Sequence, residues 1–536
     1  MKSVLSIAVM LPVILATSPQ GLAQDKSQGQ DQAQGQAQYT PQAVFCADPK
    51  TPNTLCPVLA SYIGPDSRLA KSFGYPGLYG PPPTSASEDL QTPFDNMAWQ
   101  MFVALNWARN ASGQPPAQGL AGRGLRVWQT YPKVAALFGN SPVRAPCTST
   151  LALPTFTIGS DGSGNPAPNN EEYFQASTNL PLVDINDNWT IFERRINDIE
   201  ASYLRAPNGQ KSQTLTTLGG QKQFIAKNSN GVQFTASATV TNGTNGSIEI
   251  KAAWRIIDRA AGDDPSRYYT MPARIAVAGD LVRGGRPFCR SVLVGLVGLH
   301  IIQRNPDFQT NAELLPQWIW ATFEHVDNAP VAQAPCNVRN GCGSSTWINQ
   351  PSCGAAAPSQ TVRYSYFRQN ATLQDTNIRP KAPGSGPTSY PWNSRQPYAD
   401  GGTTPATALP QATRCWSIYP TTAALNAQWQ KALGDVGSVF RNYMLIGTQW
   451  GGSVESQKGN PVPADAVPGM LSNMTLETYI QNYTGSVKNS PGPGSCVSCH
   501  NFATLPADDK TSSNFSFLPL LAQPTTARSK IKTAEP

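Results

Sequence analysis

The chain has 536 residues, with 40 basic and 33 acidic side chains and a formal net charge of +7. Charged side chains make up 14% of it, against about 25% in an ordinary soluble domain, while Gly and Pro are plentiful. This composition excludes a long coiled coil, a helical repeat array and a polytopic membrane protein. Because the basic residues do not cluster, we expect no nucleic-acid partner.

The N-terminal residues have the pattern of a secretory signal peptide. Lys2 precedes an apolar run over residues 4–16, and small residues at the expected cleavage site follow. The run is shorter than the roughly 20 residues of a spanning helix. We therefore expect residues 1–23 to be a signal peptide, residues 24–40 to be a Gln-rich flexible leader, and the protein to be periplasmic or secreted with no membrane span.

The cysteines support export. Two of the ten lie in a C-terminal motif, and the even number that remains predicts disulfides in an oxidising compartment. Cys46 and Cys56 are close enough in sequence to form a local pair. The other pairings stay open, with buried free thiols as the alternative. The remaining cysteines are Cys147, Cys289, Cys336, Cys342, Cys353 and Cys415.

The first predicted element of the body is a helix. Thr92 and Pro93 are typical of a helix start, and the spacing of apolar residues from Phe94 to Leu105 predicts that half of the helix surface lies in the core. Met97 and Met101 on that side are expected to pack rather than to bind a metal.

A β-rich region follows. Residues 234–241 and 247–254 alternate around the turn residues 242–246, which predicts a β-hairpin. Residues 292–302 and 318–326 are apolar runs of the length and composition of buried strands.

The C-terminal half adds helices to this body. Residues 380–412 are crowded with Pro, Gly, Ser and Thr and predict a long surface excursion. Residues 425–444 are helical in pattern, and residues 472–483 predict a second capped helix with Glu477 in its first turns. We therefore expect an α+β fold: a β-rich body over residues 41–485 with several helices, and a short C-terminal segment over residues 486–536.

That segment contains the sequence Cys496-Val497-Ser498-Cys499-His500. Cys-x-x-Cys-His is the attachment motif of a c-type haem, in which two thiols add to the vinyl groups and the imidazole binds the iron. A thioredoxin-like redox pair would need a βαβ setting, and a zinc site would need a second Cys/His pair at matching spacing. The motif predicts one covalent haem c on Cys496, Cys499 and His500, with His500 as the proximal iron ligand.

With this motif, the chain resembles secreted bacterial monohaem c-type cytochromes of a functionally uncharacterised group. The resemblance rests on four stretches and covers most of residues 90–520. It implies a covalent haem and export, without a substrate. The stretches are Phe94-Asp95 through Trp99-Gln100-Met101-Phe102-Val103-Ala104-Leu105-Asn106, Val297-Gly298-Leu299-His300-Ile301, Trp318-Ile319-Trp320-Ala321-Thr322-Phe323-Glu324-His325-Val326-Asp327-Asn328, and Glu477-Thr478-Tyr479-Ile480-Gln481 through the motif to Phe515-Ser516-Phe517.

A second iron ligand must come from upstream of the motif or be absent, because neither Met nor His follows His500. If the strands that hold His300 and His325 pair directly, eight residues at about 3.3 Å each separate the two by over 20 Å, so only one can reach the iron. We favour His325, because Glu324, Asp327 and Asn328 could orient its ring. His300, Met470 and Met474 are the alternatives.

The sequence leaves three functions open. The first is a periplasmic electron carrier with a periplasmic electron donor or acceptor as partner. The second is an oxidase or peroxidase-like haem enzyme with an open iron position, in which His325 or His300, with Arg304, would transfer protons. The third is a ligand-binding protein with a sensory or structural haem. The oligomeric state is left open as well.

Overall fold

The computed structural model describes residues 39–61, 63, 84–110, 119–121, 124–138, 147, 153–159, 172–176, 181–237, 245–279, 286–306, 309–310, 313–314, 318–336, 362–368, 377, 392–393, 396–399, 412–451, 466–468, 470–481 and 495–524. The expected signal peptide and most of the Gln-rich leader lie outside these ranges. From Thr40 onward the chain forms one compact unit. No helix within the described ranges is long and apolar enough to cross a membrane.

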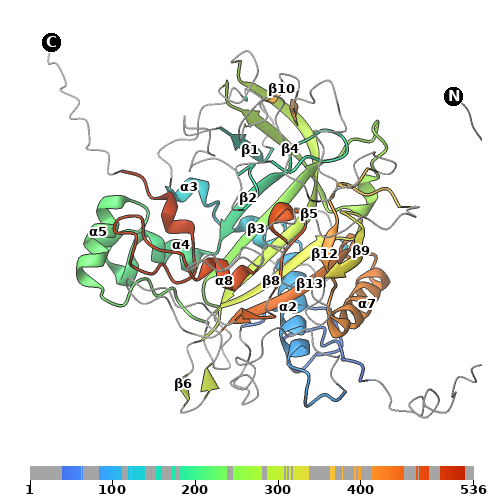
Figure 1. Ribbon diagram of the computed structural model, residues 1–536, viewed down its shortest axis with the longest axis horizontal. Helices are drawn as coiled ribbons and strands as arrows, with labels where there is room; N and C mark the ends of the chain where they lie inside the picture. The colour runs from blue at the N-terminus through green and yellow to red at the C-terminus, as the bar shows by residue number, and fades with distance from the viewer. Residues whose placement is uncertain are drawn as a thin grey trace, which may run out of the picture. The chain divides into compact units, whose positions relative to one another are not determined.

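A large mixed sheet forms the centre of this unit (Figure 1). The long strand β5 pairs along one edge with β3, and along the other edge first with β4 and then with β8. All of these pairings are antiparallel, and β1 runs parallel to β4. The strands are β1 (Thr155–Ile158), β2 (Ile191–Ile196), β3 (Ile248–Ile256), β4 (Thr270–Val277), β5 (Phe288–Arg304), β8 (Trp318–His325), β13 (Tyr443–Gly451) and β14 (Ala466–Val467).

Helices and short strand pairs surround the sheet. The expected α+β class with a β-rich body is confirmed. The helices are α2 (Gln91–Leu105), α3 (Ala135–Phe138), α4 (Asp198–Arg205), α5 (Leu218–Lys227), α7 (Pro420–Asp435) and α8 (Cys496–His500). The 3-10 turns are η2 (Val127–Thr130), η3 (Pro207–Gly209), η4 (Lys211–Gln213), η5 (Pro265–Arg267), η8 (Val439–Asn442), η9 (Thr478–Ile480) and η10 (Leu518–Leu521). The small strand pairs are β6 (Gln309–Thr310) with β7 (Glu313–Leu314), β9 (Val331–Cys336) with β12 (Arg414–Trp416), and β10 (Trp392–Asn393) with β11 (Gln396–Ala399).

The two faces of the sheet differ because side chains alternate along each strand. On one face, which we call the apolar face, Ile250, Leu299 and Phe323 join the main hydrophobic cluster. On the opposite face, which we call the charged face, the register aligns Lys251 with His300. The buried charged residues of these strands therefore gather on one side of the sheet, together with a second, smaller group of apolar residues.

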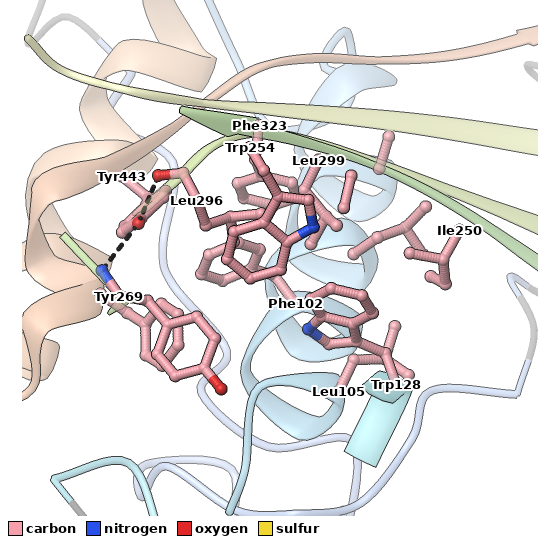
Figure 2. Close-up of a cluster of buried hydrophobic side chains, with 14 of the residues drawn as sticks. Phe102, Leu105, Trp128, Ile250, Trp254, Tyr269, Leu296, Leu299, Phe323 and Tyr443 are labelled. Carbon is pink, nitrogen blue, oxygen red and sulfur yellow. Dashed lines mark hydrogen bonds between the residues drawn. The ribbon is translucent and has the colours of Figure 1, made fainter. Parts of the chain in front are cut away.

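Helices α2 and α7 cover the apolar face. The ring of Phe102 in α2 stacks on that of Phe323, with 4.2 Å between the ring centroids. The ring of Trp99 stacks on that of Trp429 in α7, with 5.5 Å between the centroids. Figure 2 shows Phe102 within the aromatic cluster, with the Tyr443 hydroxyl group donating to the Leu296 carbonyl oxygen at 2.8 Å. This face is a conventional core, and most of the burial that stabilises the fold is expected to come from it.

The predicted helix at residue 92 is confirmed, but the expectation of half burial is wrong. Nearly every residue of α2 is buried, including polar ones. Asp89 caps the helix by accepting from the backbone N–H of Thr92 at 3.1 Å. The carboxyl group of Asp95 lies between α2 and α7, where it accepts from the amide of Gln91 at 2.7 Å and from the Thr422 hydroxyl group.

The two strands predicted over residues 292–302 and 318–326 are confirmed as parts of β5 and β8, which pair directly. The predicted hairpin is wrong in its partner. Residues 234–237 form no strand, and the edges of β3 are taken by β2 and β5. Most of its predicted turn lies outside the described residues.

The helix predicted over residues 425–444 ends early. Helix α7 stops at Asp435, Gly437 adopts a positive φ of 68°, and the chain turns through η8 into β13. The surface excursion predicted over residues 380–412 lies mostly outside the described residues.

Two disulfides close loops of this unit. The predicted Cys46–Cys56 pair is confirmed, and Cys147 pairs with Cys289 at the start of β5. Cys415 is also disulfide-bonded. Cys496 and Cys499 are not in a disulfide.

Candidate functional site

Helix α8 carries the Cys-x-x-Cys-His motif, and β13 holds its first turn in place. The side-chain oxygen of Gln449 accepts from the backbone N–H of Val497 at 2.9 Å and from the Ser495 hydroxyl group at 3.3 Å. Val497 is buried in a hydrophobic cluster on the charged face of the sheet. Figure 1 shows α8 beside β8 and β13.

The ring of His500 is fixed by one hydrogen bond. Its Nδ1 lies 2.7 Å from the carbonyl oxygen of Phe515. Because a carbonyl oxygen only accepts, Nδ1 carries the proton. Burial lowers the pKa of His500 to about 4, against the opposing effect of that carbonyl, so the ring is neutral at neutral pH. A neutral ring protonated on Nδ1 presents a lone pair on Nε2, which is the form that binds a metal.

The carbonyl that holds His500 belongs to a strained turn. Asn514 and Phe515 have φ angles of 54° and 64°, in the left-handed region that bulky residues rarely adopt. The side chain of Asn514 accepts from the backbone N–H of Phe234 at 3.2 Å, which ties the turn to the body. Strain of this kind persists where the surroundings impose it, and it is common at functional sites.

The two motif cysteines do not have the properties of a reactive redox pair. Burial raises the pKa of Cys496 well above its usual range, and the charges of Glu477 and Cys499 raise it further. Nucleophilic cysteines of disulfide oxidoreductases instead have lowered pKa values in electropositive surroundings. The site therefore does not support a thioredoxin-like redox pair.

A cavity of about 250 Å³ opens beside the motif, and both cysteines and His500 line it. This volume lies just below the range of about 300–1,000 Å³ for small-molecule sites. The strand register explains its opposite wall, because it places two rows of charged-face residues side by side. One row is Arg194, Lys251 and His300, and the other is Ile196, Glu249, Ile302 and Trp320. All of these residues line the cavity.

His300 therefore shares a cavity with the motif. Its Nε2 lies 2.9 Å from Oε1 of Glu477. Burial raises the pKa of Glu477, but His300 and the backbone N–H of Asn473 outweigh burial, and the pKa is lowered. The pair thus combines an ionised carboxylate with an imidazole at the cavity wall.

Glu477 belongs to residues 472–483, for which the sequence predicts a helix, and that prediction is wrong. Within residues 472–481, the described part of this range, only η9 is helical. The Nδ2 group of Asn473 donates to Thr322 and to the Phe323 carbonyl oxygen at 2.8 and 2.9 Å, while its Oδ1 accepts from the backbone N–H of Thr475 at 2.9 Å. This segment is therefore fastened to the sheet. Gly298 allows this approach, because a Cβ there would lie 2.2 Å from the Thr475 hydroxyl oxygen.

One end of the cavity is strongly charged. Glu172 bonds to Arg194 at 3.0 Å and to Lys251 at 2.9 Å. Burial raises the pKa of Glu172, but the two cations outweigh it and lower the pKa to about 2. Lys251 also acts on the ionised Glu477, so the two cations lie beside two carboxylates at the cavity.

His325 does not line this cavity. It is fully buried, with Nε2 at 2.8 Å from the Arg267 carbonyl oxygen and Nδ1 accepting from the Asp327 backbone N–H at 3.1 Å. Its ring stacks on Tyr268 at 4.1 Å. Burial lowers its pKa to about 4. Both ring nitrogens are already used within the protein.

The strand register explains why His300, and not His325, lines this cavity. His300 of β5 lies opposite Thr322 of β8, and His325 is three residues further along β8. The two histidines are therefore about 10 Å apart along the strand direction. The expected separation of over 20 Å assumes a different register. An odd offset also places the two side chains on opposite faces of the sheet. Glu324 and Asp327, which were expected to orient His325, direct their carboxylates to Arg414 and Arg267.

Met470, Met474 and Arg304 also lie away from the cavity. Met474 is buried in a separate hydrophobic cluster, and its backbone N–H donates to Glu324 at 2.7 Å. Met470 packs against the cluster of Cys415 and Trp416. Arg304 is buried at the end of β5 and donates to the Asn305 carbonyl oxygen at 3.0 Å. None of the three lines the cavity, so none is placed to act beside the motif.

Comparisons with known proteins give no further identification. No protein-family model matches the chain, and no match is found among curated proteins or solved structures. Within the described ranges, no group of three or more His, Cys, Asp or Glu side chains is placed to hold a metal ion.

Several residues of the cavity were missed from the sequence, namely Glu172, Arg194, Glu249, Lys251 and Trp320. A signal for two of them was present. Glu249 and Lys251 alternate with isoleucine in a strand of otherwise apolar character, which marks one face of that strand as polar. The other residues are assembled by pairings between distant strands.

Proposed function

We propose that this protein is an exported c-type haem protein that transfers electrons, with one haem attached to Cys496 and Cys499 and with His500 as the proximal iron ligand. The observation that carries the proposal is the state of His500. Its Nδ1 proton is held by the Phe515 carbonyl oxygen, and its ring faces the cavity that both cysteines line. A histidine that binds a metal through one ring nitrogen usually donates a hydrogen bond from the other, and here Nδ1 makes that bond.

The donor set fits a haem better than it fits a zinc ion or a redox-active disulfide. Two thiols outside any disulfide and a neutral imidazole follow one another on a single turn of helix. The apolar wall of Ile302 and Trp320 suits a porphyrin ring, and Arg194 and Lys251 supply positive charge for its carboxylates. When bound, the haem iron would supply one-electron redox chemistry. The Cys46–Cys56 and Cys147–Cys289 disulfides support export to an oxidising compartment.

We propose His300, in place of His325, as the second iron ligand. His300 is the histidine that lines the cavity together with the motif, and Glu477 orients its ring. As a sixth ligand it would close the iron to external molecules, which is the state expected of an electron carrier. Its partner would be a periplasmic electron donor or acceptor.

A second candidate function is a haem oxidoreductase with an open iron position. One observation favours it: Nε2 of His300, the nitrogen that histidine uses most often toward iron, is bonded to Glu477. A histidine and a carboxylate at this distance form a general acid–base pair. In this second candidate His300 would move protons at the cavity and would not bind the iron.

The visible spectrum of the purified full-length protein tests both candidates. A haem that stays on the polypeptide after acid–acetone extraction supports covalent attachment, and its loss contradicts the proposal. A low-spin ferrous spectrum that carbon monoxide does not change supports the electron carrier. A high-spin spectrum that shifts with carbon monoxide supports the enzyme, and peroxide turnover that is lost in His300→Ala would assign the acid–base role.

A further inference from the structure

Two glutamates meet at the wall of the cavity, away from the residues that would bind iron. Glu200 of α4 is 0% exposed and Glu249 of β3 is 8% exposed. Glu249 lines the cavity, and both carboxyl oxygens of Glu200 are buried without a hydrogen-bond donor among the described residues. The two carboxyl groups interact with each other, and Ser516 acts on Glu249. The pair thus connects α4, the sheet and the C-terminal segment that carries the motif.

The local structure turns Glu200 inward. Asn197 caps α4 by accepting from the backbone N–H of Glu200 at 3.1 Å. A glutamate three residues after the cap usually bonds back to the N–H of the cap residue. Here that N–H donates to the Ile248 carbonyl oxygen at 3.0 Å. The side chain of Glu200 is therefore released from its usual local partner and lies against Glu249.

The pair cannot be fully ionised at a reasonable energetic cost. Both side-chain oxygens of Glu200 are buried, and neither receives a hydrogen bond from a described donor. Two carboxylates only accept, so a hydrogen bond between them requires a proton. The cross-strand neighbours of Glu249 are Ile196 and Ile302, which give no compensation.

The surrounding charges do not replace that proton. Burial and the charge of Glu249 raise the pKa of Glu200 well above its usual range. Burial also raises the pKa of Glu249, against the smaller lowering effects of Ser516 and Arg194. The other titratable and charged side chains that line the cavity are Glu172, Arg194, Arg195, Lys251, His300, Glu477, Cys496, Cys499 and His500. Helix α4 itself also carries Asp198 and Arg205. Of these, Arg194 and Lys251 are bonded to Glu172.

We propose that Glu200 and Glu249 share one proton, and that the pair takes up a second proton when the haem in the adjoining cavity is reduced. This inference rests on the proposed function. Reduction adds one electron from the redox partner, and the extra negative charge favours protonation of the remaining carboxylate. The proton comes from water that reaches Glu249 through the cavity. With a haem bound, each electron that it accepts would be accompanied by one proton on the glutamate pair, which would go from singly to doubly protonated.

The consequence is a midpoint potential that depends on pH. Because reduction binds a proton, the potential falls as pH rises, with a limiting slope of about 59 mV for each tenfold change in proton concentration. The pair titrates as a unit, so removal of either carboxyl group abolishes the shared site. An amide in place of Glu249 or Glu200 keeps the shape and the neutral charge, so both variants are expected to fold.

The experiment is a spectroelectrochemical titration of the full-length holoprotein at several pH values, in the wild type, Glu249→Gln and Glu200→Gln. The matched control is Glu88→Gln, at an exposed glutamate outside the cavity lining. We expect a pH-dependent potential in the wild type and the control, and a loss of at least half of the slope in both other variants. A pH-independent wild-type potential, or a slope that both variants retain, would overturn the proposal.

Infrared spectroscopy separates this proposal from the proposed function, because it detects the carbonyl stretch of a protonated carboxyl group whether or not haem is present. A buried carboxyl band at neutral pH that disappears in Glu249→Gln and Glu200→Gln supports the shared proton. Its absence from the wild type overturns it. If the protein shows this band but contains no haem, the shared proton is supported, whereas the redox coupling and the proposed function are both contradicted.

Discussion

The two faces of the central sheet are built from alternate residues of the same strands, yet they differ in what they bury. The apolar face packs Ile250, Leu299 and Phe323 against α2 and α7. The charged face buries histidines, carboxylates and cations around the cavity at α8. Burial of charge costs free energy that hydrophobic packing avoids, which makes the charged face the candidate for function.

This contrast gives each face its own expected response to mutation. Changes to the apolar face should lower the free energy of unfolding and leave the cavity intact. Changes to the charged face should alter cofactor binding or its spectrum and have smaller effects on stability. Four sets of variants test this separation, in order of the size of the expected effect.

The largest effect is expected from replacing both motif cysteines. In Cys496→Ser with Cys499→Ser, haem should no longer remain on the denatured polypeptide, because no thioether bond can form. The measurement is haem staining of the denatured, electrophoresed protein. The matched control replaces Cys147 and Cys289, whose disulfide lies away from the cavity lining, and should keep the stain. Staining that survives in the motif variant would contradict the assignment.

The two upstream histidines should behave differently. His300→Ala is expected to open the iron, so the ferrous protein should bind carbon monoxide and the wild type should not. His325→Ala should leave the spectrum unchanged and lower the free energy of unfolding by about 1–3 kcal/mol, because the Arg267 carbonyl oxygen and the Asp327 N–H lose their partner. Visible spectra and urea unfolding measure these effects. A spectrum that changes only in His325→Ala would reverse our assignment.

A truncation on the apolar face should act on stability alone. Phe102 is fully buried and stacks on Phe323. Phe102→Ala is expected to lower the free energy of unfolding by about 3–5 kcal/mol. Chemical denaturation followed by tryptophan fluorescence measures the loss, and the haem spectrum of the folded variant serves as the control. A changed iron coordination in this variant would show that the faces are coupled.

The smallest effect concerns pH. Burial raises the pKa of Asp95 to about 7, against hydrogen bonds from Thr422 and Gln91. The native state therefore binds this proton more tightly than the unfolded chain, whose pKa is about 4. The stabilisation is complete below pH about 4 and is lost as pH rises through about 7.

The variant Asp95→Asn should remove this contribution. Its free energy of unfolding, measured between pH 4 and 8, should vary less with pH than that of the wild type. Asp264→Asn, at an exposed acid of the η5 turn, is the control and should keep the wild-type profile above pH 5. Identical profiles for Asp95→Asn and the wild type would show that Asp95 is ionised in the core.

The local sequence predicted the elements of the fold better than their pairing. Helix α2 and strands β5 and β8 follow from the spacing of apolar residues, because that spacing reflects the face each element buries. The partner of β3 did not follow, since β2 and β5 lie far from it in sequence. The helix predicted at residues 472–483 did not form as expected. Asn473 and Glu477 bond to each other locally, and they also bind the sheet and its histidine.

The same limit applies to the site. Cys496, Cys499 and His500 could be singled out because their chemistry depends on local spacing. The choice between His300 and His325 depended on the register of β5 against β8, where an odd offset reverses the face. No local pattern fixes that register. Glu200 was equally hidden, because its partner Glu249 lies on a strand that α4 reaches only in the folded protein.

The most direct test of the central claim is the position of the iron in crystals of the holoprotein, found by anomalous scattering at the iron absorption edge. Our account predicts a single peak in the cavity between α8 and β5, beside Nε2 of His500 and on the side of the sheet that carries His300. A peak beside His325, or the absence of any iron peak in protein matured with haem, would contradict it.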